Sequence, residues 1–287
     1  MTASTPIERL LRRDRTITIA GLAMLCGLAW AYTLSGAGLG MSVWEMTRLV
    51  LFPHLYAPSP PAGMAGMGTM PGMAAPALAT AWHPATVALM TAMWWIMMVA
   101  MMTPSAAPAI LLYARVLRHA EGRGDAAGLA PTAAFTGGYL LAWFGFAMLA
   151  VPLQLLLVAS GILGEATMAS RSAALSAAIL FAAGLYQLSP LKDACLTQCR
   201  APAAFLSRHW MRGAWGALRL GLRHGAYCVG CCWLLMLLLF VGGVMNLAWI
   251  ALLTALVLAE KLWRGGRAIG LATGVILCIW AAATLLV

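Results

Sequence analysis

Charged residues are scarce along the whole chain: Asp, Glu, Lys and Arg make up only 9% of the 287 residues, while 63% are hydrophobic. A soluble domain carries about 25% charged residues, which cover its water-facing surface. So little charge excludes an ordinary soluble globule and indicates that lipid surrounds most of the chain. We therefore predict an all-α, polytopic transmembrane helix bundle in which residues 1–287 form a single integral membrane domain.

Catalytic sequence templates are missing as well. The chain has no Gly-x-Ser-x-Gly, no His-Glu-x-x-His, no phosphate loop and no dinucleotide fingerprint, which favours a non-enzymatic protein. No nucleic-acid motif accompanies the net charge of +10, so we expect no nucleic-acid partner and interpret the charge as a topology signal. The basic N-terminal segment runs into a long apolar stretch without a clear cleavage site, which predicts an uncleaved first helix.

Apolar stretches long enough to cross a bilayer predict about seven spans. They cover residues 17–38, 83–112, 133–160, 173–191, 226–244, 246–263 and 268–287. With the N-terminus inside and the spans alternating, all but two of the 18 Lys and Arg residues fall in inside segments, the exceptions being Arg48 and Arg171. This positive-inside bias predicts a cytoplasmic N-terminus and, with seven spans, an external C-terminus.

Two connecting segments are long. Residues 53–82 are rich in Met, Pro and Gly, which predicts a flexible external loop. Residues 192–225 carry many basic residues together with Trp210 and Trp215, which indicates a cytoplasmic segment lying on the membrane interface.

Methionine is abundant, with 19 residues, and gathers in two places. The group in the external loop recurs at every third position and comprises Met64, Met67, Met70 and Met73. The group in the second span lies within about 80° on one helix face and comprises Met90, Met93, Met97 and Met101. Thioethers are soft ligands that select Cu(I). We expect metal capture in the loop. For the helical group apolar packing is the favoured interpretation, and a role in relaying the ion is the alternative.

Cysteine and histidine form a second pattern at the predicted internal ends of the fourth and fifth spans. It comprises Cys195 and Cys199, one helical turn apart, and His224, Cys228, Cys231 and Cys232, which share one helix face. Thiolates and imidazole in such an arrangement suit Cu(I) or, alternatively, Zn(II). A reducing cytoplasmic side favours free thiols over disulfides. Cys26 and Cys278, by contrast, fit small buried hydrophobic residues.

Three further residues are candidate ligands. Asp193 lies two positions before Cys195, Glu260 lies near the end of the sixth span, and His83 opens the second span at the outer end of the methionine stripe. Ionisable groups in spans are costly and usually functional, although Glu260 has an alternative role as the ion-pair partner of Lys261.

The chain resembles a bacterial family of predicted metal-binding integral membrane proteins, sometimes labelled copper chaperones, over residues 90–262. The residues that carry this resemblance are Met101, Met102, Thr103, Pro104, Pro190, Leu191, Lys192, Cys195, Cys199, Arg200, Pro202, Cys228, Gly230, Cys231, Cys232, Trp233, Met236, Met245, Asn246, Leu247, Glu260 and Lys261. The resemblance implies a bound metal and a multi-pass protein of the bacterial inner membrane. Met97 and Met101 also have the spacing found in eukaryotic high-affinity copper transporters, a likeness of parts only.

These patterns favour a membrane protein that binds Cu(I) and transfers or transports it from thioethers to a cysteine cluster. A copper-dependent protein or another chaperone is the partner that this function would serve. Two alternatives stay open: a membrane thiol–disulfide oxidoreductase that uses Cys195/Cys199 and Cys228/Cys231, and a non-catalytic assembly subunit for a copper enzyme. The oligomeric state is not indicated by the sequence.

Labelling of thiols from each side of the membrane separates the first two hypotheses. The basic-residue distribution predicts that membrane-impermeant reagents reach the clustered cysteines from the cytoplasmic side, if from either. Labelling from the outside would contradict this topology and favour the oxidoreductase, whose reactive pairs need the oxidising side.

Overall fold

The computed structural model describes residues 6–35, 47, 52, 55, 83–121, 126–164 and 168–287. Apart from an isolated bridge between Leu163 and Ser170, the regular structure in these residues is helical. The helices are α1 (Pro6–Leu34), α3 (Pro84–Glu121), α4 (Ala126–Ala159), α5 (Ala173–Leu188), α6 (Pro190–Arg200), α7 (Pro202–His209), α8 (Gly213–Leu237), α9 (Leu239–Gly242), α10 (Leu247–Leu262) and α11 (Gly266–Leu286). The prediction of an all-α helix bundle is confirmed.

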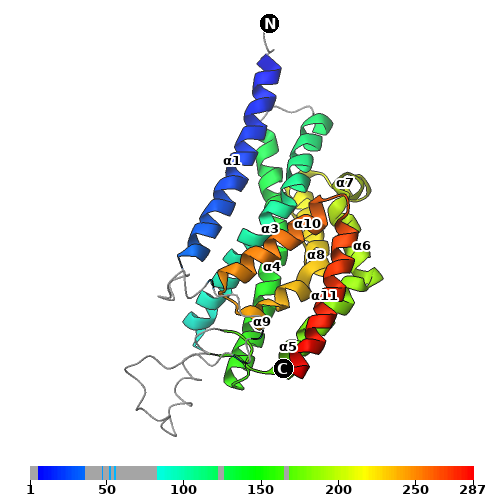
Figure 1. Ribbon diagram of the computed structural model, residues 1–287. Coiled ribbons are helices and arrows are strands. Elements are labelled where there is room, and N and C mark those ends of the chain that lie inside the picture. The colour runs from blue at the N-terminus through cyan, green and yellow to red at the C-terminus, as the bar shows by residue number, and fades with distance from the viewer. Residues whose placement is uncertain are drawn as a thin grey trace.

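Within the described residues, five helices are long and apolar enough to cross a membrane, and the bent pair α5–α6 makes a sixth if it is one span. α10 corresponds to the predicted span 246–263, but its 16 residues extend about 24 Å, less than the roughly 30 Å hydrocarbon core of a bilayer. The first turn of α1 and the last turn of α11 lie at opposite ends of the molecule (Figure 1).

Helix α8, which carries Cys228, Cys231 and Cys232, begins earlier than expected. Its continuous apolar segment runs from Gly213 to Gly242, whereas the sequence predicted a span starting at residue 226. Cys228 therefore lies near the middle of this helix, and the prediction that it marks the end of a span is wrong. The segment 192–225 forms α6, α7 and the first half of α8.

Proline shapes α3 near the middle of the bundle. Pro104 has no backbone N–H and cannot bond to the carbonyl four residues before it. That carbonyl, of Ala100, instead accepts a hydrogen bond from Nε1 of Trp30, at 3.1 Å. The carbonyl freed by the proline is thus satisfied by a neighbouring helix, which ties α1 to the outside of α3 (Figure 1).

Small residues let α4 and α8 approach closely, and these two helices form the main packing pair of the bundle. A Cβ at Gly221 would overlap the backbone carbonyl of Phe135, and a Cβ at Gly225 would overlap the side chain of Ala142. This close approach places Tyr139 of α4 directly against the cysteine-bearing turn of α8.

Gly221→Ala is expected to destabilise the protein by about 1–3 kcal/mol, because the added methyl group meets backbone rather than a movable side chain. Gly137→Ala is the matched control on α4, since a Cβ there meets nothing within 4 Å. Thermal unfolding of the purified variants in detergent checks this. Equal melting temperatures for the two variants would contradict the tight contact.

Candidate metal centre

A break between α5 and α6 positions the first two cysteines. Pro190 disfavours the helical conformation at Ser189, whose φ of −79° and ψ of 149° are extended. The two helices consequently meet at a bend of 65°. The hydroxyl of Ser189 accepts a hydrogen bond from the backbone N–H of Lys192, at 3.2 Å, and so starts the new helix. After this turn α6 packs across α8 with Cys195 and Cys199.

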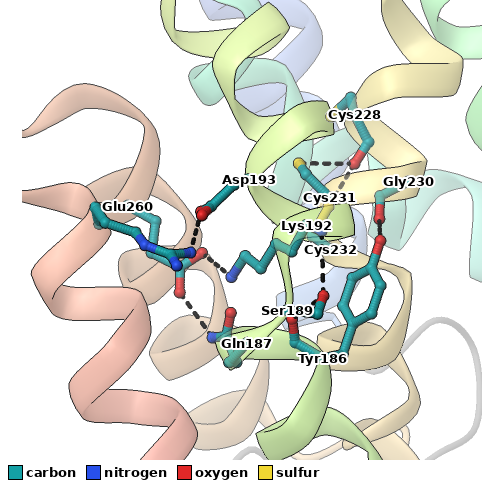
Figure 2. A network of polar contacts seen from close by, with 11 residues as sticks. Tyr186, Gln187, Ser189, Lys192, Asp193, Cys228, Gly230, Cys231, Cys232 and Glu260 are labelled. Carbon is teal, nitrogen blue, oxygen red and sulfur yellow. Dashed lines mark hydrogen bonds and ion pairs between the residues drawn. The ribbon is translucent and has the colours of Figure 1, made fainter.

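Four thiols come together where α6 meets α8. The Cys199 side chain interacts with the side chains of Cys228 and Cys231. The thiols of Cys231 and Cys232 donate to the carbonyl oxygen of Cys228, at 3.1 and 2.8 Å (Figure 2). Cys228, Cys231 and Cys232 are at most 2% exposed. We call Cys199, Cys228, Cys231 and Cys232 the thiol cluster.

Cys195 lies at the margin of this cluster. It is half-buried, and a Cβ built at Gly230 would lie 3.0 Å from its Sγ. The backbone carbonyl of the same glycine accepts a hydrogen bond from the Tyr186 hydroxyl, at 2.5 Å (Figure 2). Gly230 thus provides the space in which α5 and α6 approach α8.

Polar side chains from three other helices reach the cluster. The Tyr139 hydroxyl donates to the carbonyl of Met102, at 3.0 Å, and lies 3.1 Å from Sγ of Cys228. Nζ of Lys261 donates to the same sulfur, at 2.9 Å, and to Oγ of Ser105, at 3.3 Å. Helices α3, α4, α6, α8 and α10 therefore converge on Cys228.

Sequence reasoning missed Tyr139 and Ser105 and assigned Lys261 a different partner. A usable signal was present, because a hydroxyl-bearing residue inside an apolar span needs a hydrogen-bond partner at its own depth. Which partner it finds depends on how the helices pack, which a single sequence does not give.

His224 lies one turn before Cys228 and is 3% exposed. Its ring packs against Phe135, Tyr139 and Phe205. Its Nδ1 has no hydrogen-bond partner in the described part of the chain. A buried ring nitrogen without a partner is uncommon, and it is a donor atom available to a ligand next to the thiols.

The two candidate carboxylates lie away from the thiols, each in an ion pair. Glu260 binds Nζ of Lys192, at 2.6 Å, and Nε2 of Gln187, at 2.7 Å (Figure 2). The expected pairing of Glu260 with Lys261 is wrong, because neighbouring residues on a helix do not face each other. Asp193 pairs with Arg267 at the surface. Neither carboxylate is brought to the cluster.

The methionine stripe of α3 is mostly internal. Met93, Met97 and Met101 are buried and Met90 is half-buried. His83 is exposed, and its Nδ1 accepts a hydrogen bond from the backbone N–H of Ala85, at 3.3 Å, so that it caps the start of α3. The loop methionines, Met64, Met67, Met70 and Met73, lie outside the described residues.

Across the described helices, no three His, Cys, Asp or Glu side chains are arranged to hold a metal ion. The hydrogen bonds explain this, because Cys231 and Cys232 point their thiols back at a backbone carbonyl (Figure 2). Rotation about one Cα–Cβ bond would free such a thiol. The predicted donors are gathered, but they are not preformed as a three- or four-ligand cage.

The residues that meet at Cys228 all lie in a part of the chain that a family model matches. The family model described as copper chaperone (PpoB2) matches residues 91–284, which include the thiol cluster and all the polar residues around it. The chain belongs to this copper chaperone family. Comparison with curated proteins and with solved structures gave no significant match.

Glu260→Gln is expected to destabilise this copper chaperone family member by about 3–5 kcal/mol, because it leaves the Lys192 charge buried and unpaired. The control is Asp193→Asn, which removes a partly exposed ion pair worth about 0–1 kcal/mol. Melting temperatures of both variants in detergent measure the difference. A larger loss for Asp193→Asn would contradict the structural role of the buried pair.

Proposed function

We propose that the protein binds Cu(I) as its cargo in the thiol cluster at the centre of the helix bundle and passes the ion on. The observation that carries this proposal is the convergence on Cys228: thiols from α6 and α8 meet in a buried site lined by a tyrosine, a lysine and a histidine. Membership of the copper chaperone family supports the same cargo.

The chemistry of the donors supports a soft ion. Thiolates select Cu(I) and Zn(II), whereas hard cations prefer oxygen ligands. A structural Zn(II) site needs four ligands in a tetrahedron, which would occupy all four thiols of the cluster. Cu(I) is satisfied by two or three soft donors, which Cys199, Cys228 and Cys231 provide after a small rotation. Cu(I) is therefore the better fit, and zinc is the alternative cargo.

A route to this site follows α3. Met93, Met97 and Met101 lie on one face of the helix, and the next residue, Met102, has the carbonyl that accepts the Tyr139 hydroxyl beside Cys228. We propose that Cu(I) is captured by the methionines of the 53–82 loop and moves along these thioethers to the thiols. Neutral thioethers bind weakly and anionic thiolates bind tightly, so the affinity gradient points toward the cluster.

The topology belongs to this proposal as well. With the N-terminus inside, the part of residues 192–225 that joins α6 to α8, with Arg208 and Arg212, lies on the cytoplasmic surface of the bacterial inner membrane. The ion then moves inward to a copper-dependent protein or another chaperone. The basic residues of this segment then face the anionic leaflet. The burial of the cysteine thiols weighs against the oxidoreductase alternative, because thiol–disulfide exchange needs access for a mixed disulfide.

Replacement of Cys199, Cys228 and Cys231 by Ser is expected to remove bound copper, because hydroxyls are poor ligands for Cu(I). The control is the double variant Cys26→Ser and Cys278→Ser, which changes cysteines outside the cluster and is expected to keep the metal. Elemental analysis of protein purified after Cu(I) loading under reducing conditions measures both. Unchanged copper in the triple variant would refute the cluster as the binding site.

A further inference from the structure

Two lysines and one carboxylate are buried where α6, α8 and α10 pack together. Glu260 and Lys192 form an ion pair with side chains 3% and 2% exposed, so their charges cancel. Lys261 is buried too, and its Nζ contacts a thiol and a hydroxyl, Cys228 and Ser105. The carboxylates whose side chains the structure describes are Glu260 and Asp193, and Asp193 pairs with Arg267. One positive charge therefore remains beside the sulfur atoms.

We propose that Lys261 is the counter-charge of a Cu(I) ion held by two thiolates, and that it determines which metal the site accepts. This inference rests on the proposed function. Two thiolates and one Cu(I) have a net charge of minus one, and the Lys261 ammonium brings the buried total to zero. A net charge is costly in the interior of a membrane bundle, so a balanced set of charges is favoured.

The geometry identifies the two thiolates. Lys261 contacts Cys228 directly, and the Cys199 side chain interacts with Cys228 from the facing helix α6. When Cu(I) binds, each of the two sulfurs is in its deprotonated form, protons leave to water, and no electron is transferred. Any third donor must be neutral to keep the balance, and His224 with its unpartnered Nδ1 fits that requirement.

The sum of the buried charges also distinguishes Cu(I) from Zn(II). Zn(II) with two thiolates is already neutral, so the Lys261 charge would be left uncompensated beside it. Without that charge, Zn(II) has a balanced two-thiolate arrangement and Cu(I) does not. Lys261 thus acts on the metal through electrostatics, as a positioning and specificity residue that need not touch the ion.

The test compares metal binding by wild type, Lys261→Met and Lys261→Arg, with Arg267→Met as a control that removes a positive charge outside the cluster. Each purified protein is titrated with Cu(I) and, separately, with Zn(II) against a competing chelator under anaerobic reducing conditions. Lys261→Met is expected to weaken Cu(I) binding by about tenfold or more while Zn(II) binding is kept or strengthened. Lys261→Arg and Arg267→Met are expected to behave as wild type.

A merely structural lysine would not change the ratio of the two affinities. The inference is overturned if Lys261→Met binds Cu(I) like wild type, or if it loses both metals to the same degree. Lys261→Gln, which keeps a hydrogen-bond donor without the charge, replaces the Met variant if the latter does not fold. Wild type that fails to bind Cu(I) would refute the proposed function itself. If wild type binds Cu(I) and the triple cysteine variant does not, the Cu(I) site stands. An unchanged Lys261→Met variant would then refute only the role of Lys261 as counter-charge.

Discussion

The arrangement around Cys228 depends on a constraint that lipid imposes: every polar group in the interior must find its partner inside the protein. The sulfur of Cys228 is contacted by the hydroxyl of Tyr139 and the ammonium of Lys261. The backbone carbonyl of Cys228 accepts hydrogen bonds from two further thiols. These partners come from different helices, so one residue of α8 links α4 and α10 to it. A metal ion bound at Cys228 would be surrounded by packed, buried side chains.

Backbone features far from the thiols make this meeting possible. The glycines of α8 allow α4 to come close enough for Tyr139 to reach Cys228. The bend at Ser189 and Pro190 turns α6 so that Cys199 faces α8, and the ion pair between Lys192 and Glu260 fastens that turn to α10. Glu260 and Lys261 are adjacent in sequence, yet they point in different directions from α10 and stabilise two different contacts. The last turn of α10 therefore contacts both the Lys192 side of α6, through Glu260, and the thiol cluster, through Lys261.

The helical class and the gathering of distant cysteines could be predicted from composition and spacing alone. The position of the cluster along its helix could not be predicted. Arg219 and Arg223 lower the hydropathy of the first half of α8, so the sequence did not indicate that the membrane-length segment begins at Gly213. The role of Glu260 was misjudged for a reason that elementary helix geometry supplies, since consecutive side chains diverge by about 100°. Tyr139 and Ser105 carried no motif, and their importance follows only from tertiary packing. Asp193 and His83 match simpler roles, in a surface ion pair and a helix cap.

Binding of copper by sulfur at the middle of the bundle can be observed by X-ray absorption at the copper edge of the loaded protein. We expect the edge of Cu(I) with a first shell dominated by two sulfur atoms, and loss of that sulfur shell when Cys199 and Cys228 are replaced by Ser. A first shell made only of oxygen and nitrogen, or a sulfur shell that survives these replacements, would contradict it.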